Sequence, residues 1–151
     1  MGQQHLLLVI LVTIIVGIAT VVAINTFGSA ADSANVDAVR NDVAAIASSA
    51  QGFYMKPTML GGGGQSFAPG GTSITFEQMA FAADSLSSNG LSAINANGLY
   101  VITNASATDF TVTAHPSSDD AYSAADGFSA SADNTLEATV QPDNLTWVDA
   151  N

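Results

Sequence analysis

Two histidines and thirteen acidic residues are the side chains that could ligate a metal or move protons in this chain. His115 stands near Asp119 and Asp120, whereas His5 lies at the opposite end of the sequence. This separation predicts no metal cluster, because a metal site needs several ligands that converge on one point. The chain also has no cysteine, which excludes disulfides, thiolate-bound zinc and thiol catalysis.

The acidic residues of the segment 119–133 do not predict a calcium site either. Asp119, Asp120, Asp126 and Asp133 lack the regular spacing of a calcium-binding loop, so we expect a solvated loop there. No Ser–His–Asp set and no pair of carboxylates stands in a recognisable catalytic context. The sequence therefore predicts no catalytic residue, no bound cofactor, no small-molecule substrate and no enzyme.

Two triplets could receive a covalent modification. "NAS" (104–106) and "NLT" (144–146) match the acceptor pattern for N-glycosylation, which also occurs often by chance. Asn104 and Asn144 are therefore candidate glycosylation sites, and they would suit a protein displayed on a cell surface.

The charge balance restricts the partners. Thirteen acidic residues stand against two basic ones, Arg40 and Lys56, so the net charge is −11. Nucleic acid is excluded as a partner, because phosphate binding requires a basic patch. Only 10% of the residues are charged, so the polar surface must consist mainly of Ser, Thr, Asn and Gly. Such a surface is common in proteins outside cells.

The longest apolar segment of the chain lies near the N-terminus. Residues 6–24 of "HLLLVILVTIIVGIATVVAINTF" carry no charge, and as a helix they would extend about 28 Å, close to the apolar thickness of a membrane. A cleaved signal peptide is disfavoured, since the preceding "MGQQH" is uncharged and the run is too long. No Lys or Arg flanks the run to fix its orientation as a permanent anchor.

The helix is expected to continue beyond the run. In residues 30–54, apolar side chains recur at 3,4,3,4,3 spacing, which places them on one face of a helix. This stripe consists of Val36, Val39, Val43, Ile46, Ala50 and Phe53. Gly28 predicts a bend or loosening at residues 25–29, and the helix should end within residues 51–54, before Pro57.

The remainder predicts an antiparallel sheet that covers the stripe. After a glycine-rich flexible connection at 56–71, alternating patterns predict a short strand at 72–76 and hairpins formed by 98–103 with 109–116 and by 134–142 with 144–150. Residues 77–86 could form a short helix or an irregular crossing. The expected fold is α+β. We expect an apolar helix half at 1–29 and a globular head at 30–151, with helix at 30–54 and a β-rich region at 72–151.

This arrangement resembles that of type IV pilins, and "MGQQHLLLVILVTIIVGI" followed by "KPTMLGGGG" is similar to the opening of a group of bacterial pilin-like proteins. The resemblance implies a pilin-like fold and a subunit that waits in the inner membrane before it enters a filament. Copies of the chain would then be its main partners. The implied assembly interface comprises Leu6, Leu7, Leu8, Ile10, Leu11, Ile14, Ile15, Ile18, Val21 and Val22.

The chain departs from the family at its N-terminus. Pilins have a basic leader and a Glu near the mature terminus, which pairs with the terminal amine of a neighbouring subunit. If Met1 is the terminus, His5 occupies that place, and if cleavage follows Gly2, Leu7 does. A neutral His cannot neutralise an ammonium group as a carboxylate does. We expect His5 to act as a polar cap at the end of the apolar run.

Three functions are compatible with these features. The first is a structural subunit of an extracellular, type IV pilus-like helical filament with a role in cell adhesion. The second is a single-pass membrane protein that presents a small β-rich binding domain on the surface. The third is a minor pseudopilin of a secretion system.

Overall fold

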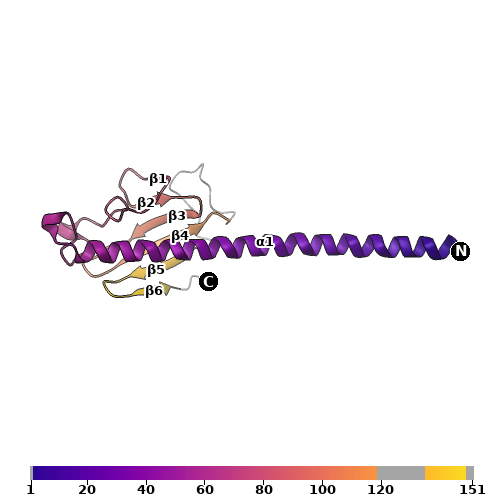
Figure 1. Cartoon of the computed structure of the whole chain (residues 1–151). Coiled ribbons are helices and arrows are strands. Elements are labelled where there is room, and N and C mark those ends of the chain that lie inside the picture. Colours follow the sequence, from indigo (N-terminus) through magenta and orange to yellow (C-terminus); the bar gives the residue numbers. More distant parts are fainter. Residues whose placement is uncertain (1, 119–134, 149–151) are drawn as a thin grey trace. The chain divides into compact units, whose positions relative to one another are not determined.

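The computed structural model describes residues 2–118 and 135–148. Its contacts form two compact units, residues 1–34 and residues 35–151. The helix α1 (Gly2–Met55) supplies the described part of the first unit and opens the second (Figure 1). No proline precedes Pro57, so no residue of α1 lacks a backbone donor. The helix ends one residue after the predicted range.

The predicted loosening of the helix at residues 25–29 is wrong, because α1 is continuous through them. One glycine in a helix costs only about 1 kcal/mol relative to alanine. Propagating a helix already formed on both sides is favourable, whereas starting a second helix would require a new nucleus. A single Gly28 is therefore too weak to interrupt α1.

The second unit contains a six-stranded, fully antiparallel sheet. Its spatial order, β1-β2-β3-β4-β5-β6, follows the sequence, so each strand pairs with the next one along the chain (Figure 1). The strands are β1 (Ser85–Leu86), β2 (Ser92–Ile94), β3 (Gly98–Thr103), β4 (Phe110–Pro116), β5 (Leu136–Val140) and β6 (Leu145–Val148). The fold is thus α+β, with a long N-terminal helix packed on an antiparallel sheet, as predicted.

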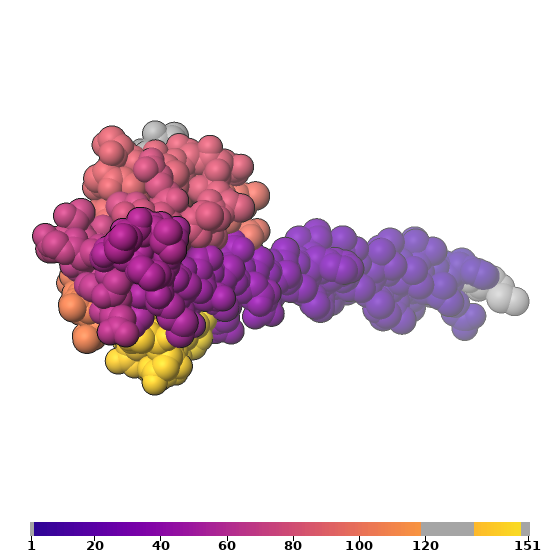
Figure 2. All heavy atoms as spheres, turned by 60° about the vertical axis from the view of Figure 1, so that its left-hand side comes forward, coloured from indigo at the N-terminus to yellow at the C-terminus, as the bar shows by residue number. Residues whose placement is uncertain are grey.

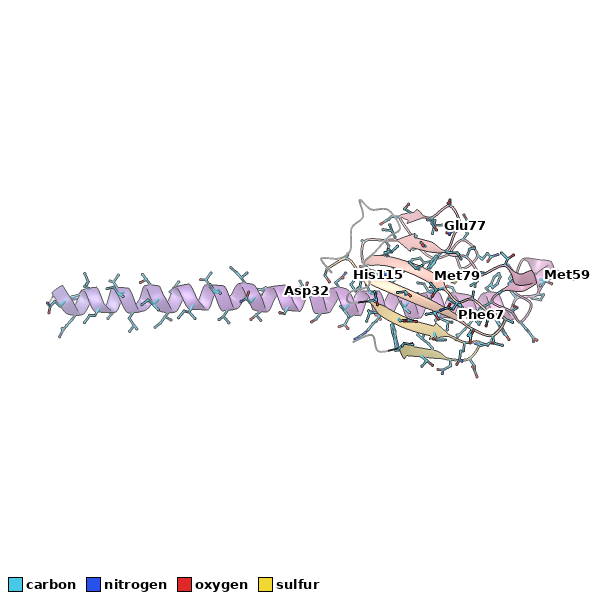
Figure 3. All side chains as sticks on the ribbon, turned by 180° about the vertical axis from the view of Figure 1, so that it is seen from behind. Asp32, Met59, Phe67, Glu77, Met79 and His115 are labelled. Carbon is cyan, nitrogen blue, oxygen red and sulfur yellow. The ribbon has the colours of Figure 1, made fainter. Side chains whose placement is uncertain are left out.

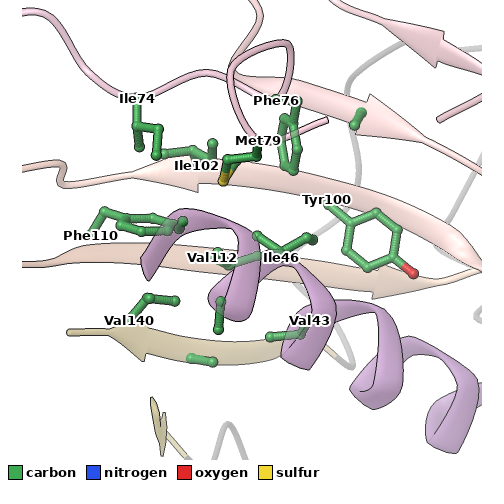
Figure 4. Packing of buried hydrophobic residues seen from close by; sticks show 14 of the residues in the cluster. Val43, Ile46, Ile74, Phe76, Met79, Tyr100, Ile102, Phe110, Val112 and Val140 are labelled. Carbon is green, nitrogen blue, oxygen red and sulfur yellow. The ribbon is translucent and has the colours of Figure 1, made fainter. Parts of the chain in front are cut away.

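The core lies between α1 and one face of this sheet. The register pairs Tyr100 with Ala114 and Val112 with Ala138, which directs alternate residues of the central strands toward the helix. Figure 4 shows Val43 and Ile46 of α1 over these strands. The helical stripe and the strand alternation therefore meet in one apolar layer.

Aromatic side chains close the two flanks of the core. Phe67 lies 4.8 Å from Tyr54 and 5.1 Å from Phe110, measured between ring centroids. On the other flank, Phe81 lies 5.2 Å from Tyr100 in an edge-to-face arrangement. Such tilted and edge-to-face contacts are the geometry that aromatic pairs prefer.

The outcome for the predicted strands differs along the chain. Both predicted hairpins are present, as β3–β4 and β5–β6. The predicted strand at 72–76 is wrong: Ile74 donates to the carbonyl of Phe67 and Phe76 to that of Gly90, so this extended segment bonds to separate residues rather than to one ladder. Residues 77–86 form an irregular crossing that ends in β1, and neither β1 nor β2 was predicted. The predicted loop at 119–133 lies outside the described residues.

Candidate assembly surface

The first unit is a helix whose large apolar side chains are exposed on every side. Fourteen Leu, Ile and Val side chains of residues 6–24 retain between 46% and 67% of their accessible area. Figure 2 shows this part in indigo and violet. Water disfavours so much apolar surface, so it fits a lipid environment or contact with other proteins. By length and composition, α1 is the one helix of the described chain able to cross a membrane.

The few hydroxyl groups of this unit are satisfied within the helix itself. Thr13 donates to the carbonyl of Ile10 and Thr20 to that of Val16, both at 2.8 Å. Thr26 and Ser33 make equivalent bonds to carbonyls four residues earlier, both at 2.9 Å. A polar group buried without a partner is costly, and these bonds remove that cost. The unit can therefore enter an apolar environment, and these hydroxyl donors keep their hydrogen bonds there.

All ten residues predicted as the assembly interface lie on this unit and are exposed. They are distributed around the helix, not along one stripe, because consecutive residues such as Leu6, Leu7 and Leu8 are all included. A helix that is apolar all round requires surroundings on every side. A single partner along one face would leave most of the surface uncovered.

The second part of α1 has the opposite character. Val39, Val43 and Ile46 have no exposed area, and Phe53 retains 5%. Val36, the first residue of the predicted stripe, is only half-buried. Ala47, which the stripe omitted, is buried as well, so the covered face is wider than one row of residues.

A carboxylate fixes α1 on the sheet. One oxygen of Asp42, Oδ2, accepts hydrogen bonds from Tyr100 Oη at 2.6 Å, Asn97 Nδ2 at 2.7 Å and Asn95 Nδ2 at 2.9 Å. Burial by itself would raise the pKa of Asp42, but the bonds from Asn97, Tyr100 and Asn95 stabilise the charged form and hold its pKa below the ordinary value. Three donors around one oxygen define both the rotation and the axial position of the helix.

Further polar contacts flank this carboxylate. Asn35 Nδ2 donates to the carbonyl of Asn97 at 3.0 Å, and its Oδ1 accepts from the backbone of Ser118 at 3.1 Å. Near the other end of the sheet, Gln51 Nε2 donates to the carbonyl of Gln141 at 3.1 Å. The buried stripe is thus held between polar contacts at both ends.

The glycine-rich segment after α1 caps the C-terminal end of this helix through backbone hydrogen bonds. Gly63 N donates to the carbonyl of Phe53 and Gln65 N to that of Tyr54, both at 2.8 Å, which satisfies carbonyls that a helix end leaves free. A Cβ on Gly63 would lie 2.0 Å from the carbonyl oxygen of Ser66, and one on Gly62 would lie 2.2 Å from that of Lys56. The predicted connection is therefore present, and its residues 62–65 hold a defined conformation against the end of α1.

Of the residues considered for chemistry, the structure describes the two histidines, which belong to different units. His5 is exposed on α1, and His115 is buried at the end of β4. Among residues 2–118 and 135–148, no group of three or more His, Asp or Glu could hold a metal ion. Asp119, Asp120, Asp126 and Asp133 lie outside the described residues.

Both candidate glycosylation sites lie at exposed turns. Asn104 follows β3, and Asn144 precedes β6. The side-chain amide of Asn144 donates to the hydroxyl of Thr146 at 3.2 Å. Because β3 and β5 both run antiparallel to β4, these two turns lie at the same end of the sheet.

Sequence reasoning missed the cluster around Asp42. The stripe at helical spacing does not include Asp42, which is polar and follows Asn41. The two asparagines at 95 and 97, just before a strong strand, were the one signal that polar side chains gather there. Their common partner could not be inferred without the register of α1 on the sheet.

Comparisons of the chain with protein-family models, with curated proteins and with solved structures find no match.

Proposed function

We propose that the protein is the structural subunit of an extracellular, type IV pilus-like helical filament. The observation that supports this most is the contrast along α1. Residues 6–24 expose apolar side chains on all sides, whereas a stripe within residues 39–53 is buried under the sheet. The second part of α1 carries the head, and the first part is available for burial among equivalent helices of other copies.

Burial of this surface is large enough to drive assembly. Fully burying one Leu, Ile or Val side chain contributes about 1.5–3 kcal/mol, so the fourteen half-exposed side chains of residues 6–24 would contribute about 20 kcal/mol in total. Lost translational and rotational freedom and the ordering of side chains oppose this gain. The free subunit would keep its apolar surface in water, so we expect it to be a minor species there.

The same helix suits two successive environments. Its length and composition are compatible with membrane insertion before assembly. Its internally bonded hydroxyl groups need no partner in lipid. Because no Lys or Arg lies between the run and Arg40, no positive charge directly after the run anchors it in the membrane.

The length of the apolar run also fits a second function, a membrane-anchored surface protein that presents the head as a binding domain. A minor pseudopilin would share the design of the filament subunit but would be made in small amounts. Abundance and filament formation therefore separate the three.

The test is the yield of filaments sheared from cells and counted by negative-stain electron microscopy. Ile14→Asp or Leu8→Asp places a charge in the proposed filament core, so we expect filaments to disappear while the subunit is still made. Ile14→Val keeps the apolar surface, and Ala82→Asp adds the same charge at an exposed position of the head. Both controls should assemble normally. Filaments of normal yield from Ile14→Asp would overturn the proposal, and wild-type cells that lack filaments would favour the membrane-anchored protein.

A further inference from the structure

The head carries a second exposed apolar surface, at the end of α1 and in the turn that follows. We call Met55, Lys56, Met59 and Leu60 the apolar tip. Met59 retains 96% of its accessible area, Met55 74% and Leu60 66%. Figure 3 places Met59 and His115 toward opposite ends of the sheet. In Figure 2 this end is turned toward the viewer, and the magenta segment lies at its surface.

The turn that presents the tip is held rigidly. Leu60 N donates to the carbonyl of Pro57 at 3.0 Å within η1 (Thr58–Leu60), and Gly64 N returns to the carbonyl of Lys56 at 2.9 Å. The backbone packs so closely that Gly62 and Gly63 leave no space for a Cβ. Because this backbone is already fixed, binding would require the ordering of the tip's side chains only.

The apolar tip also carries a positive charge in an otherwise acidic protein. Lys56 is the only lysine of a chain with a net charge of −11. The other basic residue, Arg40, already lies 3.7 Å from Asp37, and the described residues contain no ion pair that involves Lys56. A lysine that forms no ion pair with residues 2–118 or 135–148, beside exposed methionines, matches an acidic surface that also offers apolar contact.

We propose that the apolar tip docks on the acidic surface of a neighbouring copy of the same chain. This contact would join the globular heads of two subunits in the filament. This inference rests on the proposed function, which brings many copies together. Each copy offers an acidic surface, so Lys56 offsets part of the repulsion between subunits. A contact between two tips would bring their Lys56 ammonium groups together without an acidic partner, so a contact with an acidic surface is more favourable.

The contact therefore joins two different surfaces and is heterologous. A heterologous contact that does not close into a ring propagates as an open helical array. The tip thus supplies a directional contact in the head, in addition to the non-directional burial of residues 6–24. It determines how neighbouring heads are oriented, whereas the apolar helix determines whether the subunits associate.

The single lysine makes the contact directly testable by carbodiimide coupling, which joins an amine to a nearby carboxylate through an amide bond. Sheared filaments are treated with carbodiimide, denatured and separated by size. We expect covalent dimers and higher oligomers, with Lys56 of one chain joined to an Asp or Glu of another in the mass spectrum. In Lys56→Arg, which keeps the charge but removes the reactive amine, filaments should form and the oligomers should be lost.

Two further variants probe the same contact without risk to the fold, because the side chains are exposed. Lys56→Glu and Met59→Ser should increase the unassembled subunit by about tenfold, the effect of one lost favourable contact. Filaments whose subunits stay monomeric after coupling, or whose Lys56 couples to a different protein, would overturn this inference alone. The absence of filaments in wild-type cells would overturn both proposals.

Discussion

The two parts of α1 have the same backbone conformation and opposite surroundings. In residues 6–24 the large side chains are about half exposed, whereas Val39, Val43 and Ile46 are fully covered by the sheet. The presence of Val and Ile does not by itself produce this difference, because both parts contain them. The spacing of the apolar residues does: an all-round distribution requires surroundings on every side, whereas a stripe requires one layer of sheet.

The largest expected effect is on the stability of the head, when the same kind of substitution, an apolar residue to Asp, is made in each part of α1. Val43→Asp places an unpaired charge in the core and should destabilise the head by more than about 4 kcal/mol, enough to prevent folding. Ile14→Asp should leave the head folded, since the described core begins at Val39. Near-ultraviolet circular dichroism of each full-length variant in detergent measures the packing of the head. Equal loss of signal in both variants would contradict the comparison.

A smaller loss of stability is expected when a glycine with close neighbours, Gly63, is replaced by alanine than when a charge is placed in the core. Gly63→Ala should destabilise the head by about 2 kcal/mol or more, because the added Cβ would lie 2.0 Å from a carbonyl oxygen in the cap of α1. Gly28→Ala serves as the matched control, since nothing lies within 4 Å of its Cβ and alanine favours the helix. Denaturant unfolding of the head measures both. Tolerance of Gly63→Ala would show that the glycine segment is not a fixed cap.

The smallest effect concerns Asp42 and depends on pH. Asp42→Asn should destabilise the head by about 1–3 kcal/mol at pH 7, since bonds to a charged acceptor become bonds to a neutral one. The folded state holds the pKa of Asp42 below its ordinary value of 3.8. Its contribution is therefore complete above that value and is lost as the pH falls through the lower folded pKa.

The measurement is the free energy of unfolding of wild type and Asp42→Asn from pH 7 down to pH 3. The difference between them should shrink only below about pH 4. Glu77→Gln, at an exposed carboxylate, is the control and should show no such difference. A difference that stays constant across this range would contradict the role of the charged form.

The sequence predicted the elements that carry strong, regular patterns. The stripe of α1 and the alternation of β3 and β4 each extend over enough residues to identify both element and face. β1 and β2 are too short for that, with two and three residues, and their pairing depends on β3. Residues 72–76 alternate correctly and bury Ile74 and Phe76, but no neighbouring strand is in register to form a ladder.

Two local features could not be predicted for a different reason. The glycine run permits many conformations, so composition indicated flexibility, while the cap arises from close contacts with Phe53 and Ser66. Trp147 retains 37% of its area although large aromatic residues are usually well buried, because β6 is the edge of the sheet. The candidate surface at residues 6–24 was predictable, since its signal is composition and length together.

The accessibility of residue 14 in lipid-free filaments tests the central claim most directly. The chain lacks cysteine, so Ile14→Cys and Ala82→Cys each introduce a unique thiol. In sheared filaments a water-soluble maleimide should label position 82 rapidly and position 14 slowly, and detergent that dissociates the subunits should make position 14 equally reactive. Rapid labelling of position 14 in intact filaments would contradict burial of the apolar helix among neighbouring copies.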